Sequence, residues 1–506
     1  MSEPAGHPPP DAGVPADFHL AAAAGLTRTP GALVGGEPFA VWRVDPDDET
    51  GLDTLLAGAP VGPWRHLARA LVARNLAQPV PPATAAGPGV AGEAGPPGSA
   101  RAPRGAGAQV AVVVPVRNRA AALERLLPAL RETTGAALDE LVVVDDASDD
   151  AGATPAAALR CGARLVTRGH RGGPGAARNS GLAATGAPLV AFVDSDCLPR
   201  PGWLEPLLAH LVDPLVGIVA PRVVALDVRP AGRVARYEAV RSPLDRGGQP
   251  RRVVPGGAVP FVPGAALLAR REALGEGFDP SLPGGEDVDL VWRCTGAGWH
   301  VRYEPGGEVA HDHRPGLGGL VGRRLAYGRA APALARRHPG AAPPVTVSPW
   351  TLAAYLAVAA GQPAVAGGVI AAATALAARR VRGTLPDPLR SGARLAALGS
   401  VASWQAVADT AVRAALPLSL SAAIALPRSR PALAVAAVAP PLAEWHARRP
   451  SLGPLAWTAL RLADDASYGI GAWYGALRDG RPDLLVRPMP WRLAVLPLRP
   501  VPAAAP

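Results

Sequence analysis

The stretch FVDSDCLPRPGW, residues Phe192 to Trp203, decides how the central part of the chain folds. It begins with an apolar run and then places two carboxylates, Asp194 and Asp196, one residue apart. Residues two apart in a strand-like segment point to the same side, so both carboxylates can face one ligand while Ser195 points away. The alternative interpretation is an Asx turn where the chain leaves the strand.

Around this stretch, apolar strand-like runs alternate with segments of helical spacing. The runs are QVAVVVPV at 109–116, LVVVDD at 141–146, ARLVT at 163–167 and PLVAFVD at 188–194. This alternation predicts an α/β fold with a doubly wound, mostly parallel sheet, whose ligands bind beyond the carboxyl ends of the strands. We therefore expect Asp194 and Asp196 where the fourth buried strand leaves the sheet.

Further polar groups are expected at the same edge of the sheet. Asp145 and Asp146 end the run at 141–146, and the Gly-rich RGHRGGPGAARNSG, 168–181, leads into a helix that carries Arg178 and Asn179. Cationic and amide donors near a helix start can bind an anion. Carboxylate oxygens suit Mg²⁺ or Mn²⁺, which share their coordination with substrate phosphates. The pattern therefore predicts a site for a diphosphate and a divalent cation.

A second acidic group, Glu286 and Asp287, stands at the predicted start of the helix DVDLVWRCTGAG. These residues could simply favour the helix N-terminus by their charge. The functional interpretation is that Asp287 acts as a general base that takes a proton from an attacking hydroxyl. His311 and His313 follow a strand-like segment, and we expect His311 to complete a metal shell, although a surface position is the commoner fate of a histidine.

Composition narrows the class of protein. The chain of 506 residues is long enough for two or three domains. The net charge is +10, and arginine supplies the positive charges. We interpret this high arginine content mainly as coding bias, with phosphate or anionic lipid binding as the alternative. No nucleic-acid partner is expected. The three cysteines show no CxxC pairing, which argues against a disulfide framework or a zinc ribbon and fits a reducing cytosol.

Shifts in composition predict six segments. Residues 1–15 form a disordered lead without the features of a signal peptide, 16–80 a small α+β domain, and 81–108 a Pro/Gly/Ala linker. The α/β domain follows at 109–340, an apolar Ala-rich helical region at 341–445, and a C-terminal extension at 446–506.

The apolar C-terminal region has two interpretations. No charged residue occurs from Ala341 to Ala378, but GQP at 361–363 divides this run, and Arg428 and Arg430 cut a second apolar region at 414–443. The helices could lie in or across a bilayer with arginine on the cytoplasmic side, or they could be covered by protein. We expect a membrane-associated protein on the cytoplasmic side of the cell membrane, with a cytoplasmic protein as the alternative.

From about Val110 to Arg324 the chain resembles the family 2 inverting glycosyltransferases of the GT-A fold. The motifs that carry this resemblance occur in the family's order: VVVPVRNR, VVVDDASDD, GPGAARNSGL, AFVDSD, PGAALLARREAL, GFDPSLPGGEDVDLVWR and VAHDHR. The resemblance implies a metal-dependent transferase that uses a UDP-sugar. The QxxRW segment of many processive relatives is absent, and Arg323 and Arg324 in GRRLAYG would take over its diphosphate role.

The resemblance also implies roles for individual residues. Asp287 would be the base, and Asp196 and His311 would bind the cation, Mg²⁺ or Mn²⁺. The donor would be held by Pro115, Val116, Arg117, Asn118, Asp145, Asp146, Arg178, Asn179, Asp194, Glu286, Arg323 and Arg324.

More narrowly, nearly the whole chain resembles the glycosyltransferases of mycofactocin systems. This likeness implies that the small N-terminal domain is a winged-helix-like, peptide-recognition unit. It also implies that the acceptor is the peptide-derived redox cofactor mycofactocin or its precursor, and that the sugar is glucose in β-1,4 linkage. Two other hypotheses remain: a membrane-bound glycosyltransferase that makes exopolysaccharide or glycolipid, and a nucleotide-binding module without catalysis.

Overall fold

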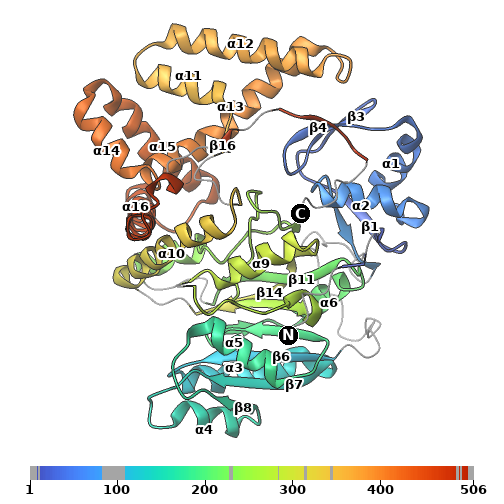
Figure 1. Ribbon diagram of the computed structural model, residues 1–506, viewed down its shortest axis with the longest axis vertical. Coiled ribbons are helices and arrows are strands. Elements are labelled where there is room, and N and C mark those ends of the chain that lie inside the picture. Colours follow the sequence, from blue (N-terminus) through green and yellow to red (C-terminus); the bar gives the residue numbers. More distant parts are fainter. Residues whose placement is uncertain are drawn as a thin grey trace.

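The computed structural model describes residues 8–9, 12–82, 109–226, 232–282, 284–312, 316–341, 346–485, 489–490 and 493–499. Part of the predicted lead and most of the predicted linker, 83–108, lie outside the described residues. The described chain forms a small α+β unit, a large sheet with flanking helices, and a group of C-terminal helices (Figure 1).

The central sheet is built from the segment that the sequence predicted to be α/β. Its strands are β6 Val110–Val116, β7 Leu138–Asp145, β8 Arg164–Thr167, β9 Leu189–Val193, β10 Cys197–Pro199, β11 Val216–Ala225, β12 Arg251–Arg252, β13 Ala266–Arg270 and β14 His300–His311. In the described part of the chain their order is β10-β14-β11-β13-β9-β6-β7-β8, with β12 beside β14.

One half of this sheet is parallel and the other half is mixed. Strands β9, β6, β7 and β8 are parallel neighbours, which confirms the predicted doubly wound α/β arrangement for this half. Strand β13 runs antiparallel to both β9 and β11, and β10 and β12 run antiparallel to β14. The expected "mostly parallel" character therefore ends at β9, because β13 enters between β9 and β11 in the opposite direction.

Helices cover both faces of the sheet and exclude water from its strands. They are α3 Ala120–Thr134, α4 Ala153–Arg160, α5 Gly173–Ala184, α6 Glu205–His210, α7 Arg233–Val240, α8 Arg271–Leu274 and α9 Glu286–Gly296. Alternate residues of β6 face different cores, so Val112 packs with Leu123 of α3 while Val113 packs with Ala177 of α5. A Cβ atom on Gly181 would lie 2.3 Å from Val113, so α5 can approach the sheet only with glycine there.

The N-terminal unit is α+β, as the sequence predicted. Its elements are β1 His19–Ala22, β2 Thr27–Thr29, β3 Ala32–Gly35, β4 Ala40–Arg43, α1 Glu49–Leu56, α2 Arg65–Ala73 and β5 Ala77–Val80. Val14 is fully buried in its core, so the packed unit begins inside the segment predicted to be a disordered lead.

The end of the chain returns to this N-terminal unit. Strand β17, Val495–Pro497, pairs parallel with β4 in a sheet of order β17-β4-β3-β2, and Leu498 joins the buried core. The predicted C-terminal extension therefore contributes to the first unit, although about 450 residues separate the two strands in sequence.

The C-terminal region is helical, as predicted. Its elements are α10 Leu317–Arg337, β15 Thr346–Val347, α11 Pro349–Ala359, α12 Pro363–Val381, α13 Pro388–Val412, α14 Leu416–Ala425, α15 Arg430–Arg448, α16 Pro454–Arg478 and β16 Met489–Pro490. Among the described residues, α12 alone is long and apolar enough to cross a membrane. If α13 and α14, which meet at a bend of 83°, are counted together as one span, the number of candidate spans rises to two. Helix α10 packs along α16.

The N-terminal unit docks on the central sheet through buried polar contacts. Arg69 of α2 pairs with Asp213 at 2.8 Å, and its guanidinium lies 3.4 Å from Nδ1 of His300. Arg302 of β14 donates to Gln78 of β5 at 3.0 Å. Burial, together with the charges of Arg252, Arg69 and Arg302, holds the pKa of His300 well below its usual 6.5.

We predict that acid weakens the protein through His300. In the unfolded chain this histidine titrates near 6.5, but the folded protein keeps it neutral, so the unfolded state binds more protons once the pH falls below 6.5. Stability should drop by at most about 1.4 kcal/mol per pH unit below that value. The measurement is the melting temperature between neutral pH and mildly acidic pH.

The variant His300→Gln should show a smaller loss of melting temperature over the same pH range, because its amide cannot be protonated there. His446→Gln, at an exposed position, serves as the control and should keep the wild-type pH dependence. Equal pH dependence in all three proteins would contradict this role of His300.

Candidate active site

The Asp-Ser-Asp segment follows β9 at the edge where the parallel strands end. The Asp194 amide donates to the Ala265 carbonyl at 2.9 Å, which continues the pairing of β9 with β13 by one residue. Ser195 is buried, whereas the side chains of Asp194 and Asp196 are 28% and 21% exposed. The Cys197 N–H donates to the Asp194 carbonyl at 3.0 Å, so Ser195 and Asp196 lie in a backbone turn and not in the strand-like segment expected from the sequence. Neither carboxylate forms an Asx-turn bond among the described residues.

Arg178 of α5 joins two of the acidic groups. Its buried guanidinium donates to Asp194 at 2.6 Å and to Glu286 at 2.9 Å, and it also donates to the Gly264 carbonyl at 3.1 Å. The ring of Phe278 lies 5.2 Å from the guanidinium carbon. The strand end at Asp194 and the start of α9 at Glu286 are therefore held together by one side chain.

The charges around Arg178 explain why it stays ionised in a buried position. Burial alone would lower the pKa of Arg178, but the negative charges of Asp194, Glu286 and Asp287 outweigh burial and raise it. Burial in turn raises the pKa of Glu286. Removing one partner from such a buried set typically costs about 3–5 kcal/mol, because it leaves an uncompensated charge.

Asp287 stands beside this ion pair at the start of α9. Its Oδ2 accepts the Gly264 N–H at 2.7 Å, and its Oδ1 accepts the Val288 N–H at 2.9 Å. A Cβ atom on Gly264 would lie 2.9 Å from the Asp287 Cβ and 3.3 Å from the Arg178 guanidinium, so this approach depends on glycine. Asp287 thus bonds the first turn of its own helix and also reaches across to the segment that leads into β13.

Asp196 forms a separate cluster with His311 and Arg119. Strand β10 pairs with β14 so that Cys197 lies opposite His311, and Asp196 Oδ1 lies 3.5 Å from His311 Nε2. Arg119 donates to the other carboxylate oxygen at 2.8 Å. Burial opposes the charge on Asp196, but His311 and Arg119 more than offset it and hold the pKa of Asp196 well below its usual range.

This pair fits a divalent cation that keeps most of its ligands from substrate and water. Asp196 and His311 supply one carboxylate and one imidazole, and Mg²⁺ or Mn²⁺ is commonly held by one or two protein ligands together with phosphate oxygens. The described residues contain no group of three or more His, Cys, Asp or Glu that could hold a metal ion. His313 lies outside the described residues.

The loops after β6 and β7 are tied to each other. Arg117 donates to Asp149 at 3.2 Å, and the backbone N–H of Asn118 donates to the Ser148 hydroxyl at 2.9 Å. Ser148 in turn donates its backbone N–H to buried Asp145 at 3.1 Å. The predicted nucleotide-binding residues at 115–118 and Asp145 therefore lie on one braced edge of the sheet.

Asp146 has a local structural partner at the start of α5. Its two carboxylate oxygens accept the N–H groups of Gly172 and Gly173 at 2.9 and 2.8 Å, and Arg168 donates to it at 2.9 Å. A carboxylate in this position stabilises a helix N-terminus. Asp146 thus fixes the Gly-rich turn against β7.

Other residues predicted to bind the donor are occupied by the fold. The side-chain amide of Asn179 bonds both the N–H and the carbonyl of Phe278, at 2.8 and 2.6 Å. Arg324 is buried and donates a hydrogen bond to Asp464 of α16, and Arg323 donates to Glu238 of α7 at 2.6 Å. These contacts position the Phe278 loop through Asn179 and attach α10 through both arginines, and the predicted donor-binding role of the three residues stays a prediction.

Two arginines near the site were not singled out from the sequence. Arg119 closes the quoted motif VVVPVRNR, and a cation there could have been noticed as a partner for the strand-end carboxylates. Arg246 is close enough to Asp287 for its pKa to respond to that charge. Nothing in the local sequence around Arg246 signals this effect, because the two residues are 41 positions apart and only the tertiary fold brings their charges together.

Comparisons with known proteins agree with this architecture. Residues 111–278 match the sequence model of Glycosyl transferase family 2. The pre-mycofactocin glycosyltransferase of Mycobacterium tuberculosis strain H37Rv is 37% identical over 469 residues, which cover 88% of this chain and 92% of that protein. The succinoglycan biosynthesis protein ExoU of Rhizobium meliloti is 29% identical over 208 residues, which cover 38% of this chain and 58% of that protein.

Among solved structures, the mannosyltransferase PcManGT from Pyrobaculum calidifontis, in complex with GDP-Man and Mn²⁺, is 25% identical. The similarity covers 58% of this chain and 86% of that chain, with a TM-score of 0.36. The family assignment rests on the sequence, through the family match and the long alignment to the mycobacterial relative. The chain belongs to glycosyl transferase family 2, in the group of the pre-mycofactocin glycosyltransferases.

Proposed function

We propose that this glycosyltransferase moves a hexose, with inversion, from a UDP-sugar to mycofactocin or its precursor, with glucose as the sugar and a β-1,4 linkage. The single observation that supports inverting transfer best is the Arg178 bridge, which sets Asp194 and the Glu286–Asp287 pair around one site. The acceptor is supported by the 37% identity with the pre-mycofactocin glycosyltransferase over 88% of the chain.

In the proposed reaction, Asp287 accepts the proton of the acceptor hydroxyl as that oxygen attacks the anomeric carbon. The new C–O bond forms on the face opposite the nucleotide, and the bond to the diphosphate breaks, so that UDP leaves with the bonding electron pair. The Gly264 N–H at 2.7 Å orients the Asp287 carboxylate for this step. Asp194, held by Arg178, lies on the donor side.

Asp196 and His311 would hold a divalent cation, Mg²⁺ or Mn²⁺, on the donor diphosphate. Such a cation, when bound, neutralises charge that develops on the leaving group. Arg119 adds a fixed positive charge beside Asp196. We propose that the donor also contacts the loop residues Pro115, Val116, Arg117 and Asn118, together with Asp145 at the end of β7.

The N-terminal unit is proposed to recognise the peptide part of the precursor. In the described chain its four-stranded sheet has β2 at one edge, while the chain's own β17 covers the other. An exposed sheet edge can bind an extended peptide as an additional strand. This assignment also rests on the winged-helix-like resemblance of the unit.

We predict that Asp287→Asn lowers hexose transfer by about 100-fold or more, because the amide cannot accept the acceptor proton. Binding of UDP in the presence of Mn²⁺ should change little. Initial transfer rates by mass spectrometry and UDP affinity by calorimetry are the two measurements. Glu276→Gln, an exposed change nearby in sequence, is the control. Wild-type turnover in Asp287→Asn would show that another group is the base.

We further predict that Asp196→Asn raises the Mn²⁺ concentration needed for half-maximal UDP binding by at least about tenfold, because a charged oxygen ligand is lost. Calorimetric titrations with UDP at a series of Mn²⁺ concentrations measure this shift. Asp139→Asn removes an exposed carboxylate on β7 and should leave the metal dependence unchanged. An unchanged requirement in Asp196→Asn would remove this residue from the metal site.

A second candidate function is the transfer of sugars to exopolysaccharide or glycolipid, and the exposed apolar C-terminal helices favour it. The packed N-terminal unit disfavours it, because such a transferase has no need of a peptide-recognition element. Mass spectrometry of the cofactor from a deletion strain separates the two: loss of sugar decoration supports the mycofactocin function, and unchanged decoration supports the alternative.

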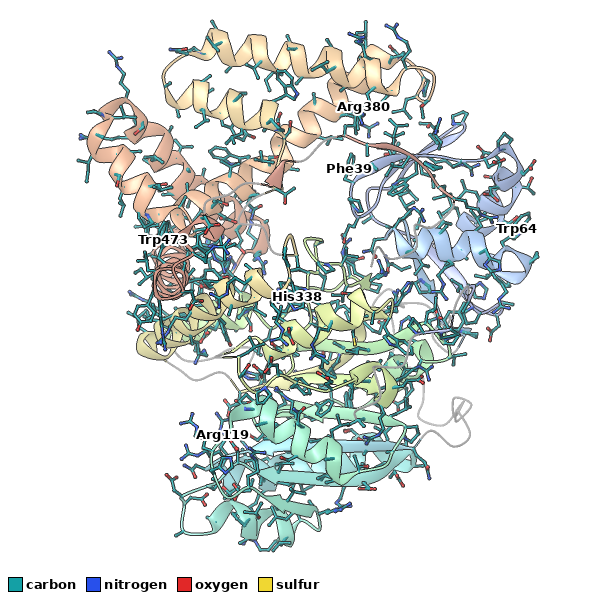
Figure 2. All side chains as sticks on the ribbon, viewed as in Figure 1. Phe39, Trp64, Arg119, His338, Arg380 and Trp473 are labelled. Atoms are coloured by element: carbon teal, nitrogen blue, oxygen red, sulfur yellow. The ribbon has the colours of Figure 1, made fainter. Side chains whose placement is uncertain are left out.

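We also propose that the C-terminal helices contact the cytoplasmic face of the cell membrane. Large apolar side chains are exposed along α11 to α15: Trp350, Leu356, Val358, Val365, Leu376, Leu389, Leu398, Val401, Leu418, Leu420, Ile424, Leu426, Val435, Val438 and Leu442. Arg379, Arg380 and Arg382 at the end of α12 are exposed as well and suit anionic headgroups. Figure 2 shows Arg380 well separated from Arg119, so membrane contact would leave the strand ends accessible.

This proposal predicts that the protein floats with vesicles that contain phosphatidylglycerol. The double change Leu420→Glu and Ile424→Glu on α14, at positions 57% and 78% exposed, should weaken flotation several-fold, since a carboxylate is costly in an apolar lipid phase. Val212→Glu, at a position 62% exposed on the central domain, should not. Wild-type protein that stays with the soluble fraction would contradict membrane contact.

A further inference from the structure

A loop near Asp287 presents a cation that the proposed mechanism does not use. Arg246 lies between α7 and β12, and both of its neighbours are fixed. Asp245 pairs with Arg222 of β11 at 2.9 Å, and the Gly247 carbonyl accepts the Tyr303 hydroxyl of β14 at 2.7 Å. Two strands of the central sheet therefore set the backbone position of Arg246.

The guanidinium of Arg246 rests on an aromatic ring and has no acidic partner in the part of the chain that the structure describes. Its carbon lies 4.1 Å from the centre of the Phe261 ring. The Nε atom is buried and has no hydrogen-bond partner, and Arg246 forms no salt bridge within the described ranges. By contrast, Arg178, Arg119 and Arg168 are each paired with a carboxylate at the same edge of the sheet. A half-buried cation without a partner is costly, so this position fits one that a bound ligand completes.

The Phe261 segment brings this cation to the base side of the site. The Pro260 carbonyl accepts the Trp292 indole N–H at 2.8 Å, and three residues after Phe261 the Gly264 N–H donates to Asp287 at 2.7 Å. Burial lowers the pKa of Arg246 to about 10, while the charge of Asp287 acts in the opposite direction. Arg246 therefore stays protonated at neutral pH.

Acceptor binding accounts for Arg246 better than donor binding does. The cation-binding pair Asp196 and His311, with Arg119, already surrounds the position proposed for the diphosphate. The carboxylates whose charges act on Arg246 are Asp287 and Asp245, not the Asp194 and Asp196 of the donor side. The attacking hydroxyl must come within reach of Asp287, and the Phe261–Gly264 segment contacts Arg246 at one end and bonds Asp287 at the other, so a molecule that brings this hydroxyl can also reach Arg246.

We propose that Arg246 is an acceptor-binding residue whose guanidinium pairs with two oxygen atoms next to the attacking hydroxyl. The planar fork of arginine suits two such oxygens, either in a carboxylate or in the neighbouring hydroxyls of a sugar. The stacked ring of Phe261 holds the fork in one plane before the acceptor arrives. This inference rests on the proposed function, because it takes Asp287 as the base of a sugar transfer.

The test compares Arg246→Ala and Arg246→Lys with the wild type, using pre-mycofactocin and, separately, cellobiose as acceptors. We expect the KM for the acceptor to rise at least about tenfold in Arg246→Ala, because hydrogen bonds to a charged group are lost. Arg246→Lys should recover little of this loss, since an ammonium group lacks the fork. The Kd of UDP with Mn²⁺ should stay near the wild-type value in both variants, and Arg160→Ala, an exposed arginine on α4, is the control.

The outcomes are distinct. A raised KM for acceptor with unchanged UDP affinity supports the acceptor role. Weaker UDP binding in Arg246→Ala would assign Arg246 to the diphosphate and overturn the inference, as would an unchanged KM for both acceptors. If the wild type transfers sugar only to cellobiose, the proposal that pre-mycofactocin is the acceptor is wrong, and the KM for cellobiose in the two variants decides the role of Arg246. If the wild type transfers to neither compound, the proposed function fails and the acceptor role fails with it.

Discussion

The buried guanidinium of Arg178 is the interaction on which the arrangement of the site depends. It is the point at which α5, the end of β9 and the start of α9 meet, through Asp194 at 2.6 Å and Glu286 at 2.9 Å. Two carboxylates brought this close would repel each other without the cation, and the cation could not be buried without them. The end of β9, proposed as the donor side, and the start of α9, proposed as the base side, are therefore held together by Arg178.

Much of this arrangement could be predicted from the sequence, because parallel strands bring their carboxyl ends to one edge. The strands ending at Val116, Asp145 and Val193 were recognisable from their apolar runs, and the structure places Asp145 and Asp194 at that edge. Local periodicity was sufficient there, since each signal lies within one short segment. The strand-like alternation expected for Asp194 to Asp196 is not formed, because the Cys197 N–H bonds the Asp194 carbonyl and closes a turn.

The sequence failed where a side chain's partner lies far along the chain. The carboxylate that Arg324 contacts, Asp464, is 140 residues away on α16, so this pairing could not be predicted from the motif around Arg324. The bonds between the Asn179 side-chain amide and the Phe278 backbone likewise join residues about 100 positions apart. The pairing of β17 with β4 could not be predicted for the same reason, because a strand of three residues does not indicate which other strand it pairs with.

The account makes Arg178 necessary for both halves of the reaction, and one measurement tests this directly. In Arg178→Lys, which keeps the charge but cannot donate to both carboxylates in the same way, UDP affinity with Mn²⁺ and the rate of hexose transfer should fall together, each by at least about tenfold, while the far-UV circular dichroism spectrum is retained. Wild-type UDP affinity and wild-type transfer in this variant would contradict the central role of the bridge.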